Sequence, residues 1–305
     1  MKSKKILITG GTGLVGNAIR KISSDYEYEF IYISSSMHDL SKFDDTQKMF
    51  ELYRPNYVIH LAACVGGLFK NMNYKVDMLE KNLMINYNVI KCAYEYKVEK
   101  LLACLSTCIF PDKVSYPIIE EDLHNGPPHD SNYTYAYAKR MLEIHCRAYR
   151  ENYDVNFTCI TPTNIYGPYD NFDLENGHVI PSLIHKCYLA KKNNIDFVIK
   201  GTGKPLRQFI YSEDLARLIM NVMEDSIIYD NVILSVPEKG EISIGDVGRL
   251  IANAFEYGDR IKFDANFSDG QYKKTVISHY AENYTFINIE DGINQTVQWF
   301  LKNKI

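Results

Sequence analysis

The sequence predicts an α/β protein built on a doubly wound parallel sheet, with a smaller α/β domain toward its C-terminus. Three observations support this fold class. The first half alternates short strand-like runs with longer helical stretches. A glycine-rich turn joins the first of these runs to the first helical stretch. After residue 165, glycines and prolines interrupt the chain more often, which indicates a separate packing unit.

The elements of the first half follow one another in a regular order. Short runs rich in β-branched residues predict strands at 6–9, 30–34, 57–61, 100–105 and 157–161. Helical stretches between them cover 15–23, 46–53, 74–96 and 135–153. Consecutive β-α-β units make the strands parallel and place helices on both faces, which is the Rossmann type of architecture.

The second half of the sequence has a different pattern of helices and strands. Helices are expected at 179–191 and 214–224, and residues 243–305 mix short helices with short strands. We therefore divide the chain into domains of residues 1–165 and 166–305, and allow later segments to return to the first sheet.

Composition excludes several classes of protein. The 305 residues are 46% hydrophobic and 24% charged, close to the globular average. The net charge of −4 provides no basic surface for nucleic acid, and no apolar run approaches the about 18 residues of a membrane span. The basic start of the chain is followed by too few apolar residues for a signal peptide. Seven cysteines show no metal-ligand or disulfide spacing, so we expect a cytoplasmic protein without a metal site.

The first strand leads into a turn in which Gly10, Gly13 and Gly16 are spaced three residues apart. Glycine permits a tight turn and a close approach of the backbone to a pyrophosphate. The following helix N-terminus offers free N–H groups and a partial positive charge. The turn therefore predicts a dinucleotide cofactor, with an ordinary strand-to-helix turn as the alternative.

The end of the second strand distinguishes NAD from NADP. An acidic residue there would bind the ribose 2′-hydroxyl and repel a 2′-phosphate. This chain has hydroxyl side chains at 34–36, and its nearest acid, Asp39, lies several residues further on. Hydroxyls can donate to a phosphate, so the sequence favours NADP(H), although no arginine is present to bind it. Asp39 and Leu40 are expected near the adenine.

A catalytic pair is expected on the helix at 135–153. Tyr135 lies four residues before Lys139, so the two side chains share one helix face. Free tyrosine has a pKa of about 10, and a neighbouring ammonium group lowers it. Ser106, at the end of the fourth strand, can hydrogen-bond a substrate carbonyl together with the phenol. The alternative is a surface Tyr–Lys pair, but the glycine turn, Ser, Tyr and Lys occur in the order of a short-chain dehydrogenase/reductase.

Over most of its length the chain resembles the GDP-L-fucose synthases, a branch of the extended short-chain dehydrogenase/reductases. The matching stretches are 60–67, 105–112, 124–129, 162–168, 170–172, 176–181, 207–211 and 268–274. The resemblance implies inversion at carbons 3 and 5 of a GDP-linked 4-keto-6-deoxy sugar, then NADPH-dependent reduction at carbon 4. It also implies a homodimer paired through the helices at 74–96 and 135–153.

The same resemblance assigns roles to individual residues. Cys108 becomes the base and His178 the acid of the inversions, and Tyr135 protonates the final alkoxide. Ser106 and Cys108 would share one face if their segment were extended. A thiolate base needs a lowered cysteine pKa, whereas His178 can supply protons at neutral pH. The alternatives are a structural cysteine and a solvated histidine.

The cofactor and substrate contacts complete the prediction. Residues expected at the cofactor are Gly10, Thr12, Gly13, Leu14, Val15, Gly16, Ser34, Ser35, Asp39, Leu40, Leu61, Ala62, Ala63, Tyr135, Lys139, Pro162 and Asn164. Lys186 and Arg207, with Lys274 as a weaker candidate, are expected at the substrate pyrophosphate. Lys200 stands where similar proteins often have an aromatic residue. Cys64 and Cys104 are interpreted as packing residues.

Four alternative functions differ in the residues that they require. A 4,6-dehydratase would need acidic residues where the chain has Thr107–Ile109, and they are missing. A simple 4-epimerase or 4-ketoreductase needs no Cys and His pair. A related GDP-deoxysugar synthase would keep both Cys108 and His178, so only overall sequence similarity distinguishes it from a GDP-L-fucose synthase. A non-catalytic NADP-binding subunit would commonly lose Tyr135 or Lys139, and both are present.

Overall fold

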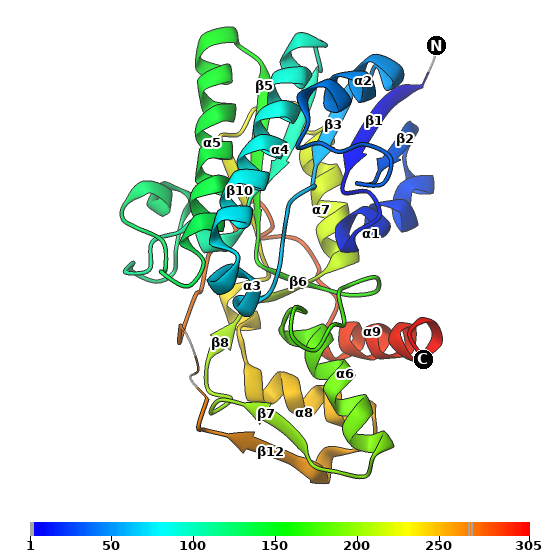
Figure 1. The fold of residues 1–305 in the computed structure, drawn as a ribbon, viewed down its shortest axis with the longest axis vertical. Helices are drawn as coiled ribbons and strands as arrows, with labels where there is room; N and C mark the ends of the chain where they lie inside the picture. The colour runs from blue at the N-terminus through cyan, green and yellow to red at the C-terminus, as the bar shows by residue number, and fades with distance from the viewer. Residues whose placement is uncertain (1–2, 268, 270) are drawn as a thin grey trace.

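A six-stranded parallel sheet forms the centre of the computed structural model, which describes residues 3–267, 269 and 271–305 (Figure 1). Its strand order is β10-β5-β4-β3-β1-β2, and every neighbouring pair is parallel. The strands are β1 (Lys4–Thr9), β2 (Tyr28–Ile33), β3 (Tyr57–His60), β4 (Lys100–Cys104), β5 (Asn156–Pro162) and β10 (Asn231–Leu234). Met1 and Lys2, and Ser268 and Gly270 of the matching stretch 268–274, lie outside the described residues.

Both faces of this sheet are buried, as parallel strands require. Ile6 and Ile8 of β1 face one apolar cluster with α1 (Leu14–Ile22) and α7 (Ser212–Glu224). Leu7 faces the opposite cluster, with α2 (Phe43–Tyr53), α4 (Lys75–Glu95) and α5 (Tyr133–Tyr153). The predicted doubly wound fold is confirmed.

A smaller unit lies below the sheet in Figure 1 and has its own apolar core. Its helices are α6 (Val179–Lys192), α8 (Ile244–Ala254) and α9 (Ile289–Asn303). Three two-stranded sheets accompany them: β7 (Phe197–Lys200) with β12 (Ile261–Asp264), β8 (Leu206–Arg207) with β11 (Ile242–Ser243), and β6 (Asn164–Tyr166) with β9 (Phe209–Tyr211). None of the helices in the described part of the chain is long and apolar enough to cross a membrane.

The chain passes between the two units more than once. After α6 and β7, residues 212–234 return to the large unit, where α7 covers the sheet and β10 pairs with β5. The predicted helices and strands are present with ends shifted by a few residues, and the helix expected at 74–96 is preceded by a separate short helix, α3 (Leu68–Asn73). The division at residue 165 stays a prediction.

Candidate active site

A cavity of about 1380 Å³ opens at the carboxyl ends of β1 to β5. Its walls come from both units, since residues of α6 and β7 line it together with the ends of these strands. All seventeen residues expected to contact the cofactor line it, as do Ser106, His178 and Lys186. No cluster of metal-ligating side chains occurs among residues 3–267, 269 and 271–305.

The glycine-rich turn forms a narrow entrance to α1. Gly10 has a φ of +68°, and a Cβ on it would lie 3.0 Å from the Ala62 backbone nitrogen. A Cβ on Gly16 would lie 2.6 Å from three backbone atoms of Gly11. Helix α1 starts at Leu14 with no acidic residue in its first turn. The turn therefore presents uncapped amides and a positive helix end to the cavity, which suits a pyrophosphate.

The side chains after β2 suit a phosphorylated ribose. Ser34 and Ser35 line the cavity, and the Ser34 and Ser36 hydroxyls hydrogen-bond at 2.8 Å. Asp39 accepts hydrogen bonds from the backbone and hydroxyl of Ser41 at 3.1 and 2.6 Å. These bonds lower the Asp39 pKa, so this carboxylate is stabilised within its own turn.

Tyr135 and Lys139 both come from α5 and line the cavity. The Lys139 ammonium donates to the Cys104 carbonyl at 2.6 Å and lies 5.9 Å from the centre of the Tyr135 ring. Burial lowers the pKa of Lys139 and raises the pKa of Tyr135 well above its usual value. The predicted lowering of the Tyr135 pKa by Lys139 is absent here, because burial dominates and neighbouring thiols add to it.

Cys108 lies beside Ser106, but not in the extended segment that was expected. β4 ends at Cys104, and the chain forms a 3₁₀ turn, η2 (Thr107–Ile109). Ser106 caps this turn, since its Oγ accepts from the Cys108 N–H at 3.4 Å. In a strand, side chains two positions apart point to the same side. Here the 3₁₀ turn, and not an extended strand, brings the Cys108 thiol and the Ser106 hydroxyl together.

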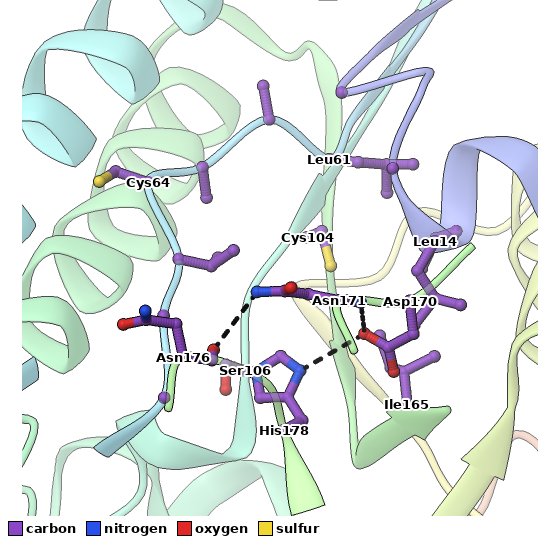
Figure 2. A pocket seen from close by; sticks show the side chains of 18 of the residues that line it. Leu14, Leu61, Cys64, Cys104, Ser106, Ile165, Asp170, Asn171, Asn176 and His178 are labelled. Atoms are coloured by element: carbon purple, nitrogen blue, oxygen red, sulfur yellow. Dashed lines mark hydrogen bonds and ion pairs between the residues drawn. The ribbon is translucent and has the colours of Figure 1, made fainter. Parts of the chain in front are cut away.

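The surroundings of three cysteines bear on the roles expected of them. Burial raises the pKa of Cys108, and the charge of Lys274 opposes that rise. Cys108 is buried and does not line the main cavity, whereas Cys104, expected in the core, is half-buried and lines it (Figure 2). Cys64 also lines the cavity, with its backbone N–H donating to Asn82 Oδ1 at 2.8 Å.

His178 is the last residue before α6, and its side chain points into the cavity (Figure 2). Its Nδ1 lies 3.9 Å from Oδ1 of Asp170, which also lines the cavity. The contact with Asp170 raises the His178 pKa, against the opposing effect of burial. Sequence reasoning missed Asp170, although it lies within a matching stretch, because no spacing links it to the histidine.

Of the three cations expected at the substrate pyrophosphate, one lines the cavity. Lys186 lines the cavity together with Lys200, and burial followed by repulsion from Lys200 lowers its pKa. The Arg207 guanidinium instead donates to the backbone carbonyls of residues 206, 271 and 272, at 2.6, 2.7 and 3.3 Å. Arg207 and Lys274 are not among the residues that line the cavity.

Comparison with known proteins gives matches over most or all of the chain. The profile of the NAD dependent epimerase/dehydratase family matches residues 6–232. The chain is 50% identical to a GDP-L-fucose synthase of Dictyostelium discoideum, over 98% of this chain and 96% of the relative. A GDP-L-fucose synthase of Escherichia coli is 33% identical, over 100% and 98%. A crystal structure of a GDP-L-fucose synthetase from Naegleria fowleri bound to NADP is similar with a TM-score of 0.94 and 46% identity, over 100% of this chain and 94% of that one.

Proposed function

The chain belongs to the NAD dependent epimerase/dehydratase family, and we infer that it carries out the GDP-L-fucose synthase reaction. It converts GDP-4-keto-6-deoxy-D-mannose to GDP-L-fucose by inversion at carbons 3 and 5 and reduction at carbon 4. The observation that carries this conclusion is 50% identity to a GDP-L-fucose synthase over 98% of the chain. The geometry supports it, because a thiol and an imidazole accompany the Ser–Tyr–Lys set.

The cofactor is NADP(H), and bound NADPH supplies the hydride for carbon 4. The residues fit this group: the glycine turn would hold the pyrophosphate, and Ser34 and Ser35 would receive the 2′-phosphate. A Cβ on Gly11 would lie 2.8 Å from Tyr32, so this part of the turn packs directly on β2 and fixes the spacing between the two phosphate sites.

The inversions require a base and an acid on opposite faces of the sugar. The C–H groups at carbons 3 and 5 are acidic because the neighbouring ketone stabilises an enolate. Cys108 Sγ removes the proton, and His178 delivers one to the other face. Ser106 and Tyr135 donate hydrogen bonds to the enolate oxygen. This division is supported by the position of Cys108 beside Ser106 and by the direction of His178 into the cavity.

Reduction uses the same donors. Tyr135 gives its phenolic proton to the alkoxide that forms at carbon 4, and Ser106 orients the carbonyl. Lys139 lines the site beside Tyr135, and its ammonium donates a hydrogen bond to the carbonyl of Cys104 at the end of β4. The raised pKa of Tyr135 keeps the phenol protonated, as a proton donor requires.

The GDP moiety extends toward the smaller unit. Of the three predicted cations, Lys186 is the best placed for its pyrophosphate, because it lines the cavity and the other two do not. Arg207 and Lys274 complete the proposed substrate set. Lys274 is close enough to Cys108 to influence its pKa, which relates it to the reacting end of the sugar as well.

The proposal includes a homodimer in a reducing, cytoplasmic setting. Helices α4 and α5 pack against each other and carry exposed apolar side chains, namely Met84, Tyr87, Met141 and Ile144. A second copy would cover this face by forming a four-helix contact. The seven free cysteines suit a reducing compartment.

A single assay tests the reaction. The enzyme is mixed with freshly prepared GDP-4-keto-6-deoxymannose, NADPH oxidation is followed by absorbance, and the sugar product is identified. GDP-L-fucose is the expected product. An unepimerised deoxysugar would leave a reductase and remove the roles of Cys108 and His178. Absence of turnover with NADPH bound would favour another GDP-deoxysugar, since a GDP-L-colitose synthase is 30% identical, or a non-catalytic NADP-binding subunit.

A further inference from the structure

Asp170 has an unusual environment for a carboxylate. It is 7% exposed, and its Oδ2 is buried without a hydrogen-bond partner in the described structure. Its Oδ1 accepts from the Asn171 N–H at 2.7 Å and lies 3.9 Å from His178 Nδ1. Burying an unpaired carboxylate is costly, so a positive partner is required. Within the described residues, the ion pair that Asp170 makes is with His178.

The loop between these two residues fixes their separation. The Asp173 carboxylate accepts from the backbone N–H groups of Glu175 and Asn176 at 3.0 and 2.6 Å. The Gly177 N–H donates to the Asp173 carbonyl at 3.0 Å, and a Cβ on Gly177 would lie 2.4 Å from that oxygen. The loop is therefore closed on itself, and it returns His178 to a defined position beside Asp170 (Figure 2).

We propose that Asp170 is the positioning residue of His178: its buried carboxylate orients the imidazole ring toward the cavity and stabilises the protonated ring. This inference rests on the proposed function, in which His178 delivers a proton to the sugar. A carboxylate behind an imidazole fixes which nitrogen is engaged and leaves the other free to react. Because the pair uses Nδ1, Nε2 is the nitrogen that faces the substrate.

The proton balance of the two inversions shows why Asp170 is needed beside His178. In one inversion Cys108 gains a proton and the His178 imidazolium loses one. Before the second inversion, the thiol must lose that proton and the imidazole must be protonated again, both by exchange with solvent. Asp170 favours the return of the proton to His178, and the raised pKa of the imidazole agrees with this role.

Other titratable groups line the same cavity. Glu175 comes from the same loop, Lys186 from α6, Lys200 from β7, and Tyr135 and Lys139 from α5. Of all these groups and Asp170, only Asp170 acts on the pKa of His178. The effect of removing its charge is therefore specific to this pair.

The test uses Asp170→Asn, which keeps the shape and the acceptor for Asn171 but removes the charge. Histidine NMR titration, assigned with His178→Gln, should show the acid dissociation constant of His178 increased by about tenfold or more. Exchange of the sugar hydrogens at carbons 3 and 5 with D₂O, without NADPH, should fall by about 10- to 100-fold above neutral pH. Since the reacting form is the imidazolium, the loss should shrink as the pH is lowered.

Glu175→Gln is the matched control, because it removes a carboxylate from the same loop, leaves the hydrogen bonds of Asp173 in place, and removes no charge that acts on the pKa of His178. It should leave the pH profile of exchange unchanged. NADPH affinity reports whether each variant is folded. An acid dissociation constant of His178 within about twofold of the wild type in Asp170→Asn, or a loss of exchange that is equal at all pH values, would overturn the proposal. If Asp170→Asn does not fold, the wild-type titration decides: a His178 pKa at or below about 6.5 overturns it. Failure of the wild type to exchange would instead refute the proposed function, while the NMR titration would still test the Asp170–His178 pair.

Discussion

Replacing Gly16 by alanine tests the glycine-rich turn most directly. The new Cβ would lie 2.6 Å from the Cα, carbonyl carbon and oxygen of Gly11, whereas ordinary contacts are 3.4–4 Å. All three atoms belong to the backbone, so no side chain can rotate away. The turn must open by about 1 Å at the point where the pyrophosphate is expected to bind. In enzymes a misplacement of about 1 Å can lower the reaction rate by about 10²-fold, and we expect a loss of similar size in cofactor affinity.

The expected result is an NADPH dissociation constant raised by about 100-fold, equivalent to about 2.7 kcal/mol. Overpacking should also reduce the free energy of unfolding by about 1–3 kcal/mol. Titration of NADPH fluorescence measures the first quantity, and denaturant unfolding measures the second.

Gly248→Ala is the matched control. Its Cβ would lie 2.1 Å from Cδ1 of Ile199, in the smaller unit. We expect a comparable or smaller loss of stability, because the end of a side chain can move, with NADPH affinity unchanged within about twofold. NADPH binding by Gly16→Ala within about threefold of the wild type would refute the reasoning, and so would an equal loss of affinity in Gly248→Ala.

The two halves of the reaction should separate by mutation. Cys108→Ser should stop deuterium exchange and leave some reduction of the unepimerised ketone. Tyr135→Phe should lower NADPH oxidation by about 10²- to 10⁴-fold while exchange persists. Equal loss of both activities in each variant would contradict these roles. Lys274→Met removes the charge that opposes the raised Cys108 pKa, so alkylation of Cys108, followed by peptide mapping, should require a higher pH; an unchanged profile would show that the charge has no influence. Tyr87→Lys combined with Met141→Lys should convert a dimer of twice 35.2 kDa to a monomer in sedimentation, and a wild type that already sediments as a monomer would end the dimer proposal.

The large unit could be predicted from local pattern because each of its strands is buried on both faces. Ile6, Leu7 and Ile8 pack alternately on opposite sides of the sheet, and such continuous apolar runs are recognisable in a sequence. The sequence allows a later segment to return to the first sheet, but it does not indicate that this segment is β10. That pairing joins residues about 70 positions apart, and no local signal encodes it.

The candidate site was predicted as a set of residues rather than as a geometry. The helical spacing of Tyr135 and Lys139 predicts that they share one face of α5, and both line the cavity. The spacing does not reveal that the ammonium contacts the Cys104 carbonyl. That contact depends on where β4 ends. Asp170 was missed for a similar reason, since its relation to His178 is created by the closed loop between them.

The position of β10 also affects the order in which the chain can fold during synthesis. β5 ends at Pro162 and its edge partner begins at Asn231, so 68 residues lie between the two strands. At a ribosomal rate of about 5–20 residues per second, the edge of β5 waits about 3–14 seconds for its partner. A chain truncated after residue 165 would lack β10, so the edge of β5 would stay unpaired and could pair with strands of other chains. The first half of this protein is therefore expected to aggregate when expressed alone, although it contains the whole glycine-rich turn.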